Sequence, residues 1–405
     1  DGSYSFVRSN KLGLNGALSI DQNIWFTGGK VSLSSSLDFM KQLGSGGSRQ
    51  FMSVPIALQL TQPIFGVNNL KWNRRIEPVR YEEAKAAFIT ATETVTMNAI
   101  TYFFNLLSAK ETLGTARQNQ VNADRLYEVA GAKRKMGQIS ENELLQLKLA
   151  ALKARAAVTD AESNLNAHMF RLRSFLAIGN DLILEPVVPE SAPNLKMEYN
   201  QVLNKALERN SFAHNIRRRQ LEAEYEVATA RGNLRSVDLF ANVGYTGLNK
   251  DLSPAYHNLL DNQVVEVGVK IPILDWGKRR GKVRVAKSNR DVTLSKIKKE
   301  QMDFDQDIFL LVEHFNNQAQ QLSIANEADK IAQQRYKTSV ETFLIGKINT
   351  LDLNDAQNSK DDARQKHINE LYWYWYYYYQ LRSLTLWDFQ NNTPLEADFE
   401  DIVKK

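Results

Sequence analysis

The chain contains an internal repeat whose two copies are separated by 209 residues. The segment Gln62-Pro63-Ile64-Phe65 matches Ile271-Pro272-Ile273-Leu274, and Met136-Gly137-Gln138-Ile139 matches Ile345-Gly346-Lys347-Ile348. The two spacings agree, because 272 minus 63 and 346 minus 137 both give 209. One register kept over so long a stretch indicates a tandem duplication, so the chain is expected to fold as two copies of one unit.

The stretches before each proline have the pattern of β-strands. Residues 31–39 and 54–60 in the first repeat, and 237–245 and 265–271 in the second, alternate apolar with mostly small or polar side chains. Such alternation is typical of strands with one apolar face. Each repeat is therefore predicted to begin with a β-hairpin.

The stretch after each proline is predicted to be a long helix. From Glu82 to Met136 there is no proline, and glycine occurs only at Gly114 and Gly131. A heptad stripe runs through it in which bulky side chains give way to alanine: Tyr81, Phe88, Val95, Tyr102, Ala109, Ala116, Ala123 and Ala130. Roughly sixty helical residues give a rod of about 90 Å, far longer than a globular helix. The turns at Gly137 and Gly346 are expected to fold each rod back, with close helix contacts at the alanine end.

The four strands predicted per chain are too few to close into a transmembrane barrel. A transmembrane barrel needs at least about eight strands, and an open edge in lipid leaves backbone groups unsatisfied. Several copies of the chain must therefore contribute strands to one barrel. A soluble β-sandwich is the alternative interpretation of the same alternation.

Composition excludes several classes of function. The chain has no cysteine. Its net charge is only +5, from interspersed charges, and this small excess argues against nucleic acid as a partner. The sequence has no run of about 18 apolar residues, so no membrane-spanning helix is predicted. The five histidines lack the HExxH spacing of zinc hydrolases, and there is no phosphate-binding GxxxxGK[ST] loop. We therefore predict no catalytic residue, no metal and no cofactor. The chain begins at Asp1 without a methionine, which we interpret as a processed or trimmed start.

The order of these motifs resembles the TolC-like outer-membrane factor family over roughly residues 30–389. The best signature is Ile271-Pro272-Ile273-Leu274-Asp275-Trp276-Gly277-Lys278-Arg279, together with Gln62-Pro63-Ile64-Phe65 and the glycine-centred turns. The resemblance implies an α+β membrane protein with two tandem repeats of a β-hairpin plus long coiled-coil helices. It implies a homotrimer that forms a 12-stranded outer-membrane β-barrel continued by a periplasmic α-helical barrel.

The resemblance also implies a domain plan, a location and partners. Residues 1–65 and 236–272 would supply barrel strands and extracellular loops, and residues 75–180, 197–235 and 278–389 the periplasmic helical tunnel. Residues 181–196, which contain Pro186, Pro189 and Pro193, and residues 390–405 would form equatorial or C-terminal segments. The protein would lie in outer-membrane lipid of a Gram-negative bacterium. It would act as the passive exit channel of a tripartite efflux or type I secretion system, docked onto a periplasmic adaptor and an inner-membrane transporter.

Site residues follow from the same resemblance. The turns that contact the adaptor in the family match Met136, Gly137, Gln138 and Ile139, and Ile345, Gly346, Lys347 and Ile348. The acidic residues that constrict the family's aperture match Asp352 and Asp355, with Glu143 at the equivalent first-repeat position. Three-fold symmetry would make rings of negative charge that favour cations; a solvated helix face is the alternative. The strand-to-helix junctions match Pro63, Pro272 and Gly277.

Some features of the sequence depart from the family pattern. Phe343 and Ile348 stand where a tyrosine and a basic residue help to lock the family's closed state. An extra alternating stretch at residues 14–20, followed by Thr27-Gly28-Gly29, has no place in the four-strand plan. The aromatic run at residues 372–379 lies roughly 40 to 50 Å from the helix turn, so it is expected to pack between helices and not against lipid. A soluble coiled-coil scaffold and a periplasmic adaptor are the alternative functions.

Overall fold

The computed structural model describes residues 10–43, 48–179, 182–188, 193, 195–235, 237–257, 259–270 and 275–397. Pro189 and Pro272, for which roles are predicted above, lie outside these ranges. The chain divides into two compact units. The first combines residues up to Glu82 with His214–Glu300, and the second combines Glu83–Ala213 with Gln301 onward.

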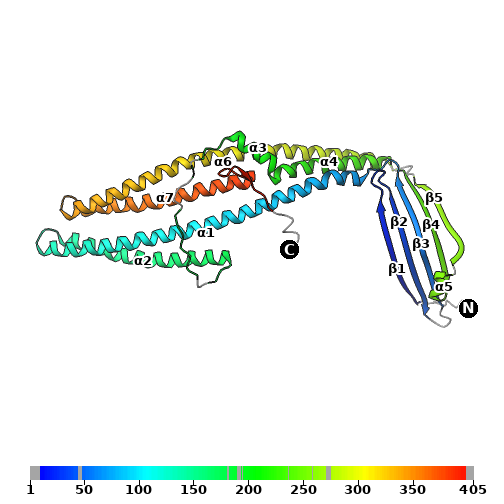
Figure 1. Cartoon of the computed structure of the whole chain (residues 1–405), viewed down its shortest axis with the longest axis horizontal. Coiled ribbons are helices and arrows are strands. Elements are labelled where there is room, and N and C mark those ends of the chain that lie inside the picture. Colours follow the sequence, from blue (N-terminus) through cyan, green and yellow to red (C-terminus); the bar gives the residue numbers. More distant parts are fainter. Residues whose placement is uncertain are drawn as a thin grey trace, which may run out of the picture. The chain divides into compact units, whose positions relative to one another are not determined.

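The first unit contains a five-stranded antiparallel sheet in the order β1-β2-β3-β4-β5 (Figure 1). Its strands are β1 Asn10–Asn23, β2 Lys30–Leu43, β3 Arg49–Pro63, β4 Asp238–Asn249 and β5 Leu259–Lys270, with the short helix α5 Leu252–His257 between the last two. Strands β2 to β5 are the four that the alternation predicts. Strand β1 covers residues 14–20, which the four-strand plan did not place. Strands β1 to β5 form one sheet and not two stacked sheets, which argues against the β-sandwich.

Long helices make up most of the rest of the chain. They are α1 Asn69–Lys135, α2 Glu141–Leu176, α3 Tyr199–Arg209, α4 Ser211–Leu234, α6 Lys278–Leu344 and α7 Thr350–Thr385. Two short strands, β6 Trp387–Asp388 and β7 Thr393–Pro394, pair after α7. Moved by 209 residues, α1 coincides with α6 and α2 with α7 at both ends. The duplication seen in the sequence therefore extends to the positions at which these helices begin and end.

None of the helices described here is both long and apolar enough to cross a membrane.

The helical stretch within residues 197–235, assigned above to the tunnel, is divided into two helices, α3 and α4. Asn210 interrupts it with an extended backbone, at φ −70° and ψ 145°. Its side-chain oxygen accepts the Phe212 amide over 2.8 Å, and its side-chain amide donates to the Leu384 carbonyl over 2.6 Å. Asparagine offers the backbone these alternatives to helical bonding, which explains a break at a position with neither glycine nor proline.

In the first unit, α4 lies between the starts of α1 and α6. Tyr225 on α4 donates to the Asn69 side chain on α1 over 3.0 Å, and Arg80 on α1 pairs with Glu222 on α4 over 2.9 Å. On the other side, Arg219 on α4 pairs with Glu300 on α6. The three helix segments are thus tied together by polar contacts along their lengths.

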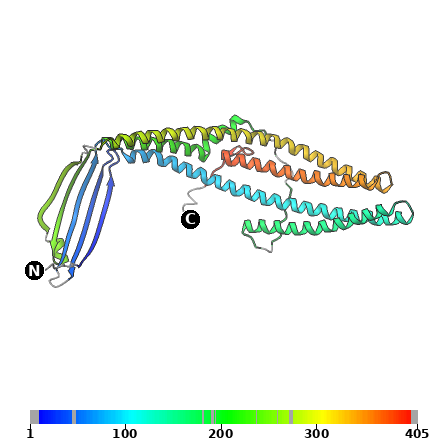
Figure 2. The same ribbon diagram turned by 180° about the vertical axis from the view of Figure 1, so that it is seen from behind.

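In the second unit, α1 and α2 form one helical hairpin and α6 and α7 form another (Figure 2). The alanine half of the heptad stripe is buried, with Ala109, Ala116, Ala123 and Ala130 all at most 9% exposed. This burial confirms the expected close helix contacts at that end. The stripe is exposed at its other end, where Tyr81, which belongs to the first unit, is 58% and Phe88 43% exposed.

The aromatic run of α7 packs inside the second unit, as predicted. Tyr374 and Tyr378 are buried in a core with residues of α3 and α6, including Val202 and Phe315. The Tyr374 hydroxyl donates to the Pro193 carbonyl, so the proline-rich segment is attached to α7. Burial raises the pKa of Tyr374 to about 12. These aromatic residues therefore belong to the helical core.

A partly buried ionic cluster joins α1, α6 and α7. Arg364 on α7 donates to Glu111 on α1 over 2.7 Å and to Asp329 on α6 over 3.1 Å. The Asp329 side chain is only 4% exposed. Burial acts to lower the pKa of Arg364, but its hydrogen bonds to Glu111 and Asp329 and the negative charges of these carboxylates outweigh burial and raise that pKa. The guanidinium thus holds both repeats together in the middle of the second unit.

Candidate docking and aperture site at the helix turns

The two helix turns have the same construction. Gly137 and Gly346 adopt left-handed conformations, with φ of +71° and +77°. Gly137 donates its amide to the Arg134 carbonyl over 3.0 Å, and Gly346 donates to Phe343 over 3.0 Å. A glycine directly beyond a helix end reaches this conformation without steric cost. The glycines at the 209-residue spacing are therefore the residues that end α1 and α6.

Each following helix begins with a reciprocal capping box. Glu143 accepts the Ser140 amide over 2.8 Å, and the Ser140 hydroxyl accepts the Glu143 amide over 3.2 Å. In the second repeat, Asp352 and Asn349 make the equivalent pair of bonds. The bonds from Ser140 lower the pKa of Glu143. Two of the predicted aperture carboxylates thus have a local structural role as well, which the spacing of Ser140 to Glu143 and of Asn349 to Asp352 signals in the sequence.

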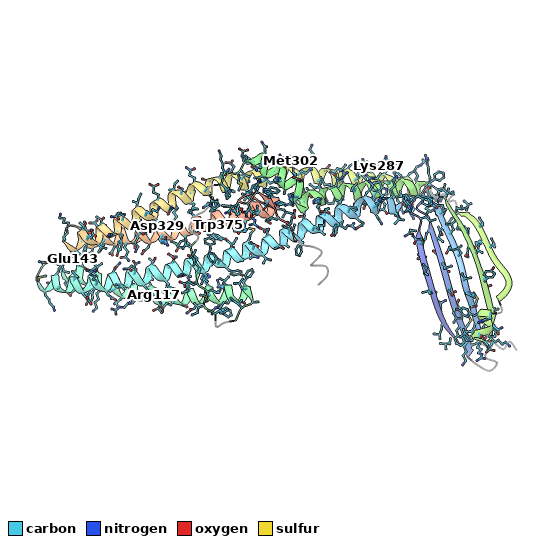
Figure 3. All side chains as sticks on the ribbon, in the orientation of Figure 1. Arg117, Glu143, Lys287, Met302, Asp329 and Trp375 are labelled. Carbon is cyan, nitrogen blue, oxygen red and sulfur yellow. The ribbon has the colours of Figure 1, made fainter. Side chains whose placement is uncertain are left out.

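The two turns lie together around one groove. Its volume is about 680 Å³, and its lining comes from both turns: Gln138, Ile139, Glu143, Ile345, Gly346, Lys347, Ile348 and Asp352. A core of Leu126, Ala130, Leu147, Tyr336, Leu353 and Ala356 lies among the four helices next to it. Figure 3 shows Glu143 at the turn end of the α1–α2 hairpin. Residues predicted separately in each repeat therefore share one surface.

Of the predicted turn and aperture residues, Met136, Gly137 and Asp355 are not part of the groove lining. The Met136 side chain is 64% exposed at the first turn. Asp355 instead faces α6, where its carboxylate accepts from Arg335 over 2.6 Å. Arg335 carries no motif signal, because its partner lies twenty positions away across a turn. It is a charged residue of this site that sequence reasoning missed.

Lys133 connects the ends of α1 and α6. Its ammonium group donates to the Leu344 carbonyl over 3.3 Å and lies 5.7 Å from the centre of the Phe343 ring. A cation near an aromatic face is attracted to it. Phe343 thus takes part in a contact between the two repeats of one chain.

The strand-to-helix junctions are described in part. Pro63 ends β3, and the amide of the next residue, Ile64, donates to the Val237 carbonyl over 2.8 Å. Gly277, with φ of +79°, donates to the Asp275 carboxylate over 3.1 Å, and Arg279 donates to it over 3.0 Å. The bond from Arg279 is the main reason why the pKa of Asp275 is lowered. Asp275 therefore caps the start of α6.

Among the described residues, no three histidine, aspartate or glutamate side chains are grouped so as to hold a metal ion. The carboxylates of Glu143 and Asp352 are instead engaged in helix caps, and that of Asp355 in an ion pair.

The fold combines a five-stranded antiparallel sheet with two 67-residue helices, α1 and α6. Residues 27–177 and 202–385 match the family described as outer membrane efflux protein, and the chain belongs to this family. The family is one of channel proteins, so the chain is an outer-membrane exit channel for efflux that extends into the periplasm. The family match sets aside the alternatives of a soluble scaffold and an adaptor.

Solved structures show the same fold. The chain is 15% identical to CusC, with 93% of this chain and 83% of that chain covered and a TM-score of 0.67. It is 17% identical to the CmeC outer membrane channel of Campylobacter jejuni, with 98% and 80% covered and a TM-score of 0.64. For the outer membrane protein VceC of Vibrio cholerae the identity is 13%, the coverage 93% and 86%, and the TM-score 0.64. A comparison with curated protein sequences finds no match.

Proposed function

We propose that the paired turns are the docking end of a passive conduit and that they bind the hairpin of a periplasmic adaptor. Energy for transport comes from an inner-membrane transporter in the same assembly. The observation that carries this proposal is the groove shared by the two turns, because it presents residues of both repeats on one surface.

The chemistry of the turns supports a protein partner. Met136 is 64% and Ile345 67% exposed, so each turn presents a large apolar side chain to solvent. Lys347 and Gln138 add polar groups at the groove. Apolar anchors with polar groups beside them are the usual composition of a protein interface.

We also propose that Asp352, Asp355 and Glu143 set the charge of the aperture in the trimer. Repeated by three-fold symmetry, these carboxylates form rings that attract cations and repel anions. Arg335 offsets part of this charge at Asp355, since the two side chains form an ion pair. The expected preference for cations is therefore moderate.

Photo-crosslinking in cells tests the docking proposal. A photoreactive amino acid is placed at Met136 or Ile345, and in a control chain at Val121, a 64% exposed apolar residue of α1 that lies fifteen positions before Met136. Crosslinks from both turn positions to a periplasmic adaptor, absent from the Val121 chain, are the expected result. The same products from all three positions would contradict docking at the turns.

A further inference from the structure

Strand β1 is not part of the duplicated unit. Moved by 209 residues, its range Asn10–Asn23 falls on residues 219–232, which lie inside helix α4. The same shift superposes α1 on α6 and α2 on α7. The first repeat thus has a strand where the second has a helix, and β1 needs an explanation of its own.

The hairpin of β1 and β2 is built into the sheet. The two strands pair without a register shift from Asn10 opposite Leu43 to Asn23 opposite Lys30. Their turn is tied to the rest of the first unit, because Asn68 donates to the Trp25 carbonyl over 2.7 Å and Gln62 donates to the Thr27 carbonyl over 3.2 Å. Strand β1 is therefore as firmly registered as the other strands.

One row of side chains across all five strands is apolar. Ile20 is opposite Leu33, Leu33 opposite Leu58, Leu58 opposite Val243, and Val243 opposite Val265. Cross-strand partners point to the same face of a sheet. The exposed fractions of these five side chains and of Leu18 on β1 range from 39 to 71%. The apolar face thus continues from β5 onto β1 without interruption.

The adjacent row on the other face is polar. It runs through Asp21, Ser32, Gln59, Asn242 and Glu266, one residue from each strand. Strands of outer-membrane channels alternate in this way, with apolar side chains toward lipid and polar side chains toward the water-filled lumen. Strand β1 has 14 residues, and about 9 to 11 suffice to cross a bilayer.

From these rows we infer that β1 is a fifth bilayer strand of each chain, with Leu12, Leu14, Leu18 and Ile20 in contact with lipid acyl chains. An exposed apolar surface of this extent in water would favour aggregation. The trimer then contributes more strands to the channel wall than the twelve of a four-strand plan. This inference goes beyond the docking proposal and depends only on the outer-membrane location.

A rival arrangement follows from strand direction. In an antiparallel sheet the first and fifth strands run in the same direction. If β1 of one copy paired directly with β5 of the next, the two strands at this seam between copies would therefore be parallel. If β2 to β5 alone formed the wall, all seams would be antiparallel, but β1 would have to leave β2. The two arrangements therefore differ in whether β1 stays paired with β2 in the assembled trimer.

Disulfide trapping distinguishes the two arrangements, and the chain offers a background without cysteine. The variant Ala17→Cys/Ser36→Cys joins residues opposite each other on β1 and β2. The control Ser32→Cys/Gln59→Cys joins β2 to β3, which both arrangements keep. We expect both pairs to oxidise in membranes and both oxidised proteins to remain conducting trimers. Loss of the trimer, or failure to oxidise, for the β1–β2 pair alone would overturn the inference.

Single-cysteine labelling tests the lipid contact itself. In vesicles of phospholipid, Leu18→Cys and the reference Leu58→Cys should react with a thiol reagent confined to the acyl-chain region, and not with a membrane-impermeant reagent. Ser19→Cys, on the opposite face of β1, should show the reverse. Reaction of Leu18→Cys with the impermeant reagent, while Leu58→Cys stays protected, would contradict the inference. Neither experiment involves an adaptor, so a failure here is distinct from a failure of the docking proposal.

Discussion

Asp352 and Asn349 hydrogen-bond to each other in both directions at the start of α7. The Asp352 amide donates to the Asn349 side chain over 2.9 Å, and the Asn349 amide donates to the Asp352 carboxylate over 3.4 Å. Asp352 thus has a helix cap to maintain as well as a charge to present at the proposed aperture. Substitutions that separate these two roles make the most informative variants.

Asp352→Asn should remove the charge and keep the cap, because an amide oxygen can accept the same backbone hydrogen bond. Asn349→Ala should do the opposite and cost about 1 kcal/mol of local helix stability. We expect weaker cation selectivity with normal amide protection at the start of α7 in the first variant. In the second we expect normal selectivity with faster hydrogen exchange there. Identical effects of the two variants on selectivity would contradict a charge role for Asp352.

Arg335→Met should increase cation selectivity, and Asp355→Asn should decrease it. The ion pair between them is half exposed, so its loss should change stability by at most about 1 kcal/mol. Reversal potentials in asymmetric potassium chloride measure the effect. Arg117→Met, which breaks the exposed pair with Glu162 elsewhere in the second unit, is the matched control. Equal reversal potentials in all three variants would argue that Asp355 lies away from the ion path.

Arg364→Met should destabilise the second unit strongly. It leaves Asp329, 4% exposed, as a buried charge without its cation, and breaking such a pair costs about 3 to 5 kcal/mol. Replacing Glu111 and Asp329 by leucine in the same chain should recover much of this loss, because no buried charge then remains. Thermal unfolding of the detergent-solubilised protein is the measurement. A single variant as stable as the wild type would show that the cluster contributes little.

His367 should make the second unit less stable in mild acid. Burial lowers the pKa of this imidazole below its ordinary 6.5, although Asp329 acts in the opposite direction. Between the folded pKa and 6.5 the unfolded chain binds more protons, so stability falls as the pH drops below about 6.5. Denaturant unfolding between pH 7 and 5 should show a decline that His367→Gln reduces and the exposed His257→Gln does not. An unchanged decline in His367→Gln would place the effect elsewhere.

Much of the fold can be predicted from the sequence because the physical signals are repeated. The long helices follow from a heptad stripe and from the scarcity of glycine and proline, and Gly137 and Gly346 mark their turns. Strand β1 has the same alternation as its neighbours, but a four-strand plan left no place for it. The break at Asn210 depends on the Leu384 carbonyl, a tertiary partner that local sequence does not reveal.

The candidate site could be predicted in its positions but not in its contacts. The 209-residue offset pairs Glu143 with Asp352, and the capping patterns beside them are readable in the sequence. The ion pair of Arg335 with Asp355 and the contact of Lys133 with Phe343 depend on how neighbouring helices are rotated about their axes. That rotation is set by packing in the core around Tyr336 and Leu353, which a single sequence does not specify.

The most direct test of the channel assignment is single-channel recording from the detergent-solubilised protein in planar bilayers. The channel assignment predicts that a trimeric species inserts and gives discrete, ohmic conductance steps, with a preference for cations that Asp352→Asn/Asp355→Asn weakens. A species that remains monomeric in water without detergent and gives no conductance at any voltage would contradict it.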